Sequence, residues 1–131
     1  MKYLLDTNIC VYWLKGNEHI EQKVLSGGID NIFVSFITVS ELYYGAYKSE
    51  RVDENLAMIR NLIDHINVIE SDDAISEAFG KLKASLENAG LIIDDADMFI
   101  AACALVHGLT MVTNNTKHFK RIKELKLDNW M

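Results

Sequence analysis

The sequence predicts an α/β fold in which a short, mostly parallel sheet is flanked by helices. Short apolar runs alternate with longer stretches that carry apolar residues at helical spacing, which is the pattern of strands joined by crossover helices. Half of the 131 residues are apolar and 24% are charged, the balance of a globular protein. No proline, Gly/Ser-rich stretch or repeat interrupts the chain, so we expect residues 1–131 to form one domain.

The first half of the chain contains two strand candidates and two helix candidates between them. Residues 3–5 are an apolar run that ends at Asp6, and residues 32–37 are β-branched, aromatic and apolar, as expected of a strand covered on both faces. Residues 9–14 and 20–25 have helical spacing, and glycines follow both stretches.

The second half repeats this alternation. The stretch from Met98 to Val106 is apolar or small throughout, which indicates a buried helix closed by Gly108. Gly90 ends the helix before it, in a position that suits a C-terminal glycine. The remaining elements are expected as helices at 39–46, 52–66 and 75–86 and as strands at 68–69 and 111–113.

Composition excludes several classes of protein. The net charge of −6 argues against a protein that simply coats nucleic acid. Cys10 and Cys103 are too isolated for a disulfide scaffold or a zinc finger. No apolar run is long enough for a transmembrane helix, and the N-terminus lacks a signal peptide, so a cytoplasmic protein is expected.

Oxygen-bearing side chains follow the predicted strands. Asp6 comes directly after the first strand, Glu41 lies about one helical turn beyond the second, and Asn114-Asn115 follow the last. Asp97 lies at the start of the buried helix. Because ligands of open parallel sheets bind beyond the carboxyl ends of the strands, we expect these side chains to share one rim.

Each of these residues also has a purely structural interpretation, which the sequence leaves open. These are an N-cap at Asp6, a capping box from Thr38 to Glu41, a helix-dipole role for Asp94, Asp95 and Asp97, and a turn at Asn114-Asn115. The four histidines have no mutual spacing that suggests a site and are expected at the surface: His19, His65, His107 and His118.

The gathering of acids at one rim favours a metal site. Asp94 and Asp97 are three residues apart and repel on one helix face, and Asp6 and Glu41 add to that repulsion. A hard cation such as Mg²⁺ or Mn²⁺ removes the penalty and serves phosphodiester hydrolysis. A basic segment downstream is suited to hold the phosphate backbone, which leads to a nuclease hypothesis: Lys117, Lys120, Arg121, Lys123 and Lys126.

Four motifs, in order, resemble those of PIN-domain ribonucleases. They are Leu4-Leu5-Asp6-Thr7-Asn8; Ser40-Glu41-Leu42 with Gly45; Asp97-Met98-Phe99-Ile100-Ala101-Ala102; and Val112-Thr113-Asn114-Asn115 with Phe119 and Arg121-Ile122. Their spacing and the chain length are similar to those of the VapC toxins of type II toxin–antitoxin pairs. The resemblance covers nearly the whole chain.

The resemblance implies a three-layer PIN-like fold, metal-dependent endoribonuclease activity, dimerisation and silencing by a VapB-type antitoxin, with transfer RNA as a plausible substrate. Asp6, Glu41 and Asp97 match the acidic ligands of the family. Asn115 departs from the pattern, because relatives often carry a fourth acid there, and Asp94 is a candidate for the missing charge. The Thr113 hydroxyl is a candidate to position a water or a phosphate oxygen.

Other functions are alternatives to a toxin. The first is a PIN-fold nuclease that processes RNA without an antitoxin, which the sequence does not separate well from a toxin. A catalytically silent binding module is another, and the full set of three acids argues against it. A phospho-acceptor signalling domain would need an acidic pair and a late Lys-Pro, whereas the chain has no proline. A haloacid-dehalogenase-type phosphatase would need an aspartate where Asn8 stands.

Overall fold

The computed structural model describes residues 1–131 and contains a parallel sheet in the order β3-β2-β1-β4-β5. The central strand is β1 at Tyr3–Leu5, which lies between β2 at Ile32–Ser35 and β4 at Thr110–Val112. β3 at Asn67–Ile69 and β5 at Leu127–Asp128 form the edges. All neighbouring strands run in the same direction, so their carboxyl ends lie along one edge of the sheet, and the α/β fold class is confirmed.

Seven α-helices and one 3-10 turn connect these strands. They are α1 at Thr7–Leu14, α2 at Glu18–Gly27, the 3-10 turn η1 at Ile29–Asn31, α3 at Phe36–Lys48, α4 at Val52–His65, α5 at Asp73–Asn88, α6 at Asp95–His107 and α7 at Thr116–Phe119. Every helix expected from the sequence is present, with ends that differ by a few residues. None of the helices combines the length and the hydropathy that crossing a bilayer would require.

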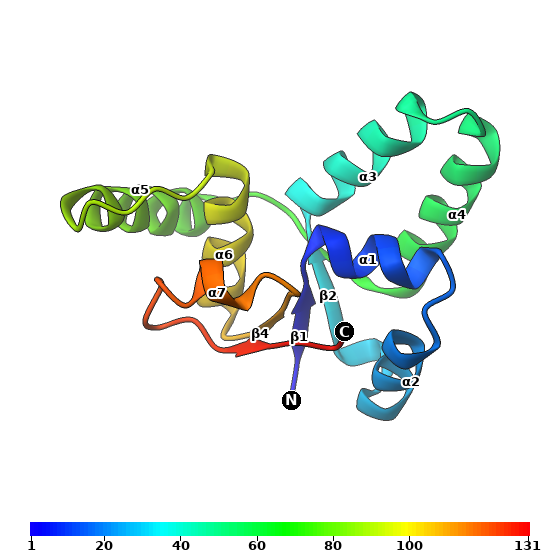
Figure 1. Ribbon diagram of the computed structural model, residues 1–131, viewed down its shortest axis with the longest axis horizontal. Coiled ribbons are helices and arrows are strands. Elements are labelled where there is room, and N and C mark those ends of the chain that lie inside the picture. Colours follow the sequence, from blue (N-terminus) through cyan, green and yellow to red (C-terminus); the bar gives the residue numbers. More distant parts are fainter.

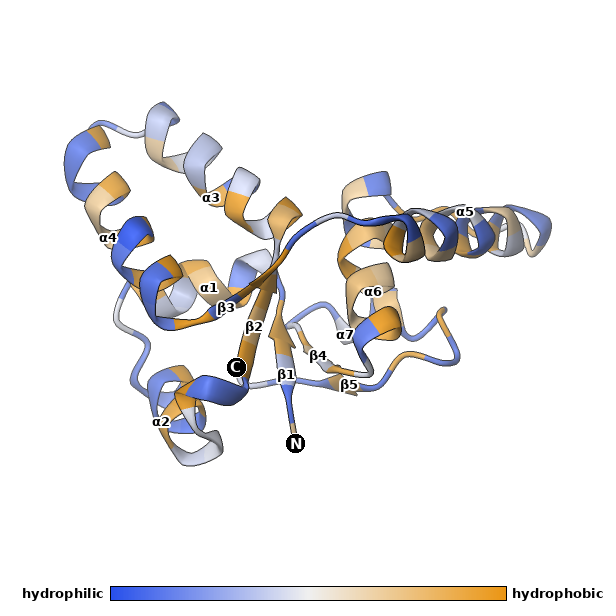
Figure 2. Cartoon of the chain, turned by 180° about the vertical axis from the view of Figure 1, so that it is seen from behind, coloured by the Kyte–Doolittle hydropathy of each residue, from blue (hydrophilic) through white to orange (hydrophobic).

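Helices cover both faces of the sheet, which gives three layers (Figure 1). Successive side chains of a strand point to opposite faces, and Leu4 and Leu5 of β1, both fully buried, belong to separate hydrophobic clusters. The Leu4 cluster is completed by α5, α6 and α7, and the Leu5 cluster by α1 to α4. Figure 2 shows β1 and β2 as hydrophobic, whereas hydrophilic and hydrophobic residues alternate along α4 and α5.

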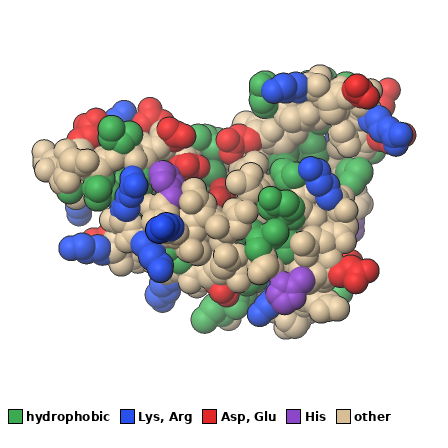
Figure 3. Space-filling model, viewed as in Figure 1, with side chains coloured by type: hydrophobic (Ala, Val, Ile, Leu, Met, Phe, Trp, Pro, Cys, Tyr) green, Lys and Arg blue, Asp and Glu red, His purple; other side chains and the backbone are tan.

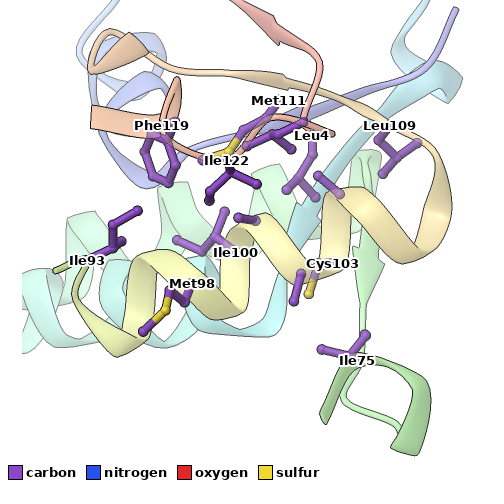
Figure 4. Packing of buried hydrophobic residues seen from close by; sticks show 14 of the residues in the cluster. Leu4, Ile75, Ile93, Met98, Ile100, Cys103, Leu109, Met111, Phe119 and Ile122 are labelled. Atoms are coloured by element: carbon purple, nitrogen blue, oxygen red, sulfur yellow. The ribbon is translucent and has the colours of Figure 1, made fainter. Parts of the chain in front are cut away.

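The apolar helix α6 is the largest contributor to the Leu4 cluster. Residues 100–104 are all fully buried, so the prediction of a buried helix is confirmed. Figure 4 shows Ile100 of this helix pointing toward Leu4, Met111 and Ile122. Gly108 ends the helix in a left-handed conformation, with φ at +65°.

One strand is shorter than the sequence predicts. The expected strand at 32–37 ends at Ser35, whose side-chain oxygen accepts a hydrogen bond from the Thr38 backbone N–H at 3.1 Å and thereby caps α3. Phe36 and Ile37 form the first turn of that helix and pack against the Leu4 cluster. The sequence did not reveal this boundary, because residues 32–37 are nearly all apolar on both sides of it.

The basic C-terminal segment contains structure that the sequence analysis did not predict. It forms α7 and the edge strand β5, and the carbonyl of Lys126, the residue before β5, accepts from the Met111 N–H at 2.8 Å. Phe119, Ile122 and Leu125 are buried between the lysines, and Trp130 packs edge-on against Tyr3 at 5.0 Å between ring centroids. The segment is therefore part of the domain rather than a tail.

Candidate active site

The structure brings Asp6, Glu41 and Asp97 to the carboxyl edge of the sheet, as the sequence predicts. Asp6 directly follows β1, Glu41 lies in the second turn of α3, and Asp97 lies in the first turn of α6. The charges of Asp97 and Glu41 both act on Asp6. Acidic side chains gather along the hollow between the α3–α4 arm and the α5–α6 side of the molecule (Figure 3).

Asp6 is buried, with 6% of its surface exposed, and both of its carboxylate oxygens accept a hydrogen bond. The Thr7 backbone N–H donates to Oδ1 at 2.8 Å, and the Thr113 hydroxyl donates to Oδ2 at 2.9 Å. Burial raises the pKa of Asp6, the negative charges of Asp97 and Glu41 raise it further, and these two hydrogen bonds oppose the rise. Asp6 does cap α1, but the cap leaves a buried carboxylate whose charge the chain does not neutralise.

Glu41 is fixed by hydroxyl groups rather than by helix capping. The Thr7 hydroxyl donates to Oε1 at 2.6 Å, and the Thr38 and Thr7 hydroxyl oxygens lie 3.0 Å apart. Because Thr7 gives its single proton to Glu41, Thr38 is the donor to Thr7, and Ser35 in turn donates to Thr38 at 3.4 Å. These aligned hydroxyls lead from the buried end of β2 to the carboxylate. The capping box from Thr38 to Glu41 is therefore wrong, because the N-cap of α3 is Ser35.

We expect Glu41→Gln to lower RNA cleavage without destabilising the fold. The glutamine amide removes the negative charge at the rim but keeps an oxygen that can accept from the Thr7 hydroxyl. A loss of activity of roughly ten- to a hundredfold is typical when the surroundings of a metal site change. Ser35→Ala is the contrast, because it removes the true cap of α3 and should lower the free energy of unfolding by about 1 kcal/mol. Urea unfolding and RNA cleavage measured on both variants check this, and a Glu41→Gln protein as unstable as Ser35→Ala would contradict it.

The three acids near the start of α6 have different environments. Asp95 forms an ion pair with Lys83 at 3.0 Å, with both side chains well exposed. Asp94 occupies the N-cap position but makes no side-chain capping bond. Burial raises the pKa of Asp97, and the charges of Asp94 and Glu41 add to the rise, while His118 opposes it. Asp97 is thus the member of this group that faces the other acids.

Thr113 and Asn115 lie beside Asp6, at the end of β4. Thr113 is fully buried, and its hydroxyl donates to Asp6 and accepts from the Asn115 backbone N–H at 3.0 Å. This hydroxyl therefore orients the Asp6 carboxylate. Asn115 is exposed and makes no side-chain capping bond, although it occupies the N-cap position of α7.

The sequence analysis missed His118. It was expected at the surface, but its Nε2 lies 3.4 Å from Asp97 Oδ2 and its side chain is only 23% exposed. Neither its spacing nor its neighbours in the sequence indicate this position, because α7 was not predicted.

Exposed basic side chains surround α7 next to the acidic hollow, and Figure 3 shows them as a cluster on that side of the molecule. The predicted backbone-binding residues Lys117, Lys120, Arg121 and Lys123 are all exposed. Arg121 also has a structural role, because its guanidinium donates to the Ile92 carbonyl at 2.9 Å and holds the loop before α6.

The donor set fits a hard divalent cation. The donors are carboxylate oxygens, and burial and mutual repulsion oppose ionisation of Asp6 and Asp97 unless positive charge is supplied. No group of three or more His, Cys, Asp or Glu side chains is placed so that it could hold a metal ion by itself. An open arrangement suits Mg²⁺, which retains several waters and is usually held by one or two carboxylates together with substrate phosphates.

Comparison with known proteins identifies the family. The PIN-domain family model matches residues 3–125. Ribonuclease VapC2 of Haemophilus influenzae is 37% identical over 131 residues, covering all of this chain and 99% of the relative. The tRNA(fMet)-specific endonuclease VapC of Shigella flexneri is 34% identical, covering 99% of this chain and 98% of the relative.

Solved structures agree with this result. A chain of the Rickettsia felis VapBC2 complex bound to a promoter DNA fragment superposes with a TM-score of 0.92 at 36% identity, with complete coverage of both chains. A chain of the DNA-bound VapBC complex of Salmonella typhimurium gives a TM-score of 0.95 at 33% identity, covering 100% of this chain and 99% of the other. This chain therefore belongs to the PIN-domain family and, within it, to the VapC ribonucleases.

Proposed function

We propose that this protein is the toxin of a type II toxin–antitoxin pair and acts as a Mg²⁺- or Mn²⁺-dependent endoribonuclease. The observation that carries the proposal is that Asp6, Glu41 and Asp97, contributed by three distant segments, lie at the same carboxyl edge of the sheet, where the charges of Asp97 and Glu41 act on Asp6. Transfer RNA is the proposed substrate class, since the relative from Shigella flexneri is named for tRNA(fMet).

Three groups of residues have different proposed roles in this activity. Asp6, Asp97 and Glu41 are the proposed metal ligands, with Asp94 and Asn115 as further candidates. When bound, the divalent cation neutralises charge that develops on the phosphodiester and activates the attacking water. Thr113 and Thr7 hold the carboxylates of Asp6 and Glu41 in place through the hydrogen bonds described above. Lys117, Lys120, Arg121 and Lys123 are the proposed contacts of the RNA backbone.

The proposed partner is a VapB-type antitoxin, since the similar structures are VapBC complexes. A groove of about 310 Å³ between α1, α3 and α4 offers a place for it. Val11, Leu42 and Met58 contribute to its apolar lining, and Glu41 also lines it, so a segment bound there would contact one of the three acids. A homodimer is the proposed form of the toxin.

Cleavage by the purified chain tests the proposed activity. We expect endonucleolytic cleavage of tRNA with Mg²⁺ or Mn²⁺ and none in excess chelator, because the donors are all oxygens. Attack by water leaves a 3′-hydroxyl and a 5′-phosphate, whereas attack by the RNA 2′-hydroxyl leaves a cyclic phosphate. End analysis of the products therefore checks the mechanism independently of the rate. Undiminished cleavage in chelator would exclude the metal mechanism, and no cleavage with either ion would favour a binding module.

We expect the lysines around α7 to bind the RNA backbone. Replacing Lys117 and Lys120 with Gln should weaken RNA binding. It should also make the association constant depend less steeply on salt concentration. The slope of log K against log[salt] should fall in magnitude by about 0.7 for each phosphate of single-stranded RNA that a lysine no longer neutralises. Filter binding over a range of salt concentrations measures the slope, and Lys23→Gln with Lys81→Gln, two exposed lysines on α2 and α5, is the control with equal charge. Arg121 is left in place because it holds the Ile92 loop. Equal slopes for both double variants would show that the α7 lysines are only solvated.

A further inference from the structure

His118 holds the one buried side-chain nitrogen or oxygen in this structure that has no hydrogen-bond partner, Nε2. The atom lies 3.4 Å from Asp97 Oδ2, close to hydrogen-bond distance but without hydrogen-bond geometry. Buried polar groups in folded proteins are almost always paired, so an orphaned one beside an active-site carboxylate calls for an explanation in terms of function.

The fold gives the imidazole little freedom. His118 lies in α7, next to Phe119, which is 1% exposed and anchors the helix in the Leu4 cluster. The two rings meet edge-on, with centroids 5.2 Å apart and planes at 84°. The start of α7 is fixed by the bond from the Asn115 N–H to the Thr113 hydroxyl. The imidazole is therefore presented to Asp97 by a well-anchored backbone.

We infer that His118 is a positioning residue that orients the Asp97 carboxylate for metal binding by donating its Nε2–H to Oδ2. The inference rests on the proposed metal-dependent function. Hydrogen bonds of active sites are often long before ligands bind and tighten in the loaded complex. Groups that hold a metal-binding side chain are needed for affinity, and their loss typically weakens metal binding or activity by about 10- to 100-fold.

The same segment would then support two of the proposed ligands. Thr113 donates to Asp6 at one end of residues 113–119, and His118 faces Asp97 at the other. The relation is analogous to that of Thr7 and Glu41, in which a neighbouring donor fixes a carboxylate. Each of the three acids would thus have a donor of its own.

Mn²⁺ binding to four proteins tests the inference, with calorimetry for affinity and spin-echo electron paramagnetic resonance for the ligands. His118→Leu removes the donor at similar size, and His118→Gln retains an amide N–H at about the reach of Nε2. His107→Leu is the control, because His107 is exposed in the last turn of α6. We expect His118→Leu to bind Mn²⁺ about 10- to 100-fold more weakly than wild type. His118→Gln should stay within about threefold of wild type, and His107→Leu should equal it.

Further measurements separate positioning from other roles. At subsaturating Mn²⁺ the kcat for RNA should fall with His118→Leu while KM stays unchanged, and the wild-type spectrum should show no nitrogen coupling to the ion. Nitrogen coupling that disappears in His118→Leu would make His118 a ligand and overturn the inference. If His118→Leu fails to fold, His118→Asn takes its place, because the shorter asparagine amide does not reach Asp97 Oδ2. This variant should then bind Mn²⁺ as weakly as is expected for His118→Leu.

The outcomes also distinguish the inference from the function on which it rests. If His118→Leu binds Mn²⁺ as wild type does while Asp97→Asn does not bind, the role of His118 is refuted and the metal site stands. If wild type binds no Mn²⁺ and still cleaves RNA, both proposals fail.

Discussion

Asp97→Asn and Asp6→Asn are each expected to reduce RNA cleavage by at least about a thousandfold while the protein remains folded. A metal ion contributes several kcal/mol to the stabilisation of the transition state, and each 1.4 kcal/mol corresponds to a factor of ten in rate. Asparagine keeps the size of the side chain and one oxygen but removes the charge that holds the cation. Single-turnover cleavage at saturating RNA measures the loss in the chemical step.

The chain supplies a matched control on the same helix. Asp95 lies two residues before Asp97, is exposed and pairs with Lys83, so Asp95→Asn removes an equal charge without touching the proposed site. This variant should cleave RNA at nearly the wild-type rate, because Asp95 lies outside the proposed site. It should also remain nearly as stable as wild type, because exposed ion pairs contribute little to stability. Equal activity of Asp95→Asn and Asp97→Asn would show that Asp97 has no special role in cleavage.

Thermal unfolding should respond to Mg²⁺ in wild type but not in Asp97→Asn. A free Mg²⁺ concentration about a hundredfold above the dissociation constant adds about 2.7 kcal/mol to the free energy of unfolding. For a chain of this length, that corresponds to a rise in Tm on the order of 10 °C. The variant should lose most of this gain, since one ligand has no charge.

In chelator, where no cation is bound, wild type is not expected to be more stable than Asp97→Asn. The raised pKa values of Asp6 and Asp97 mean that the folded state binds protons more tightly than the unfolded state. These groups therefore favour folding below their ordinary pKa, and the contribution is lost as the pH rises through the raised value. At neutral pH without metal, Asp97→Asn should be as stable as wild type or more so, and wild type should gain stability on mild acidification.

A role confined to the helix dipole makes a different prediction for the same melting curves. Asp97 would then contribute roughly 0.3–1 kcal/mol to stability in chelator and in Mg²⁺ alike. A variant destabilised equally in both conditions, with wild type and variant responding alike to Mg²⁺, would identify Asp97 as a helix-end charge.

Much of the fold could be predicted from the sequence because its strands are buried on both faces. Leu4-Leu5 is a continuous apolar run followed directly by an acid, and the position of Asp6 at the carboxyl edge follows from that alone. The same reasoning located Glu41 and Asp97, since parallel strands place their carboxyl ends together. The pattern of apolar residues was sufficient to predict the end of a strand or helix wherever hydrophobicity changed at that end.

The rest depended on interactions between distant residues. The cap of α3 at Ser35 was hidden within an apolar run, so the pattern favoured a capping box for Glu41, whereas its partner is Thr7, 34 residues earlier. The C-terminal segment resembled a basic tail because its buried residues are spaced between lysines. The short helix and edge strand formed there depend on pairing with β4, and without them His118 could not be placed beside Asp97.

The hydrogen bond from Thr113 to Asp6 spans 107 residues of a chain made from its N-terminus on the ribosome. Asp6 is polymerised long before the strand that lies beside it, β4, and before the segment that holds its carboxylate. Folding into such a non-local arrangement waits until both partners have left the exit tunnel. A nascent or prematurely terminated chain that lacks residues 110–119 thus carries all three acids without an assembled site. Translation must therefore pass residue 119 before the three acids can be assembled beside one another.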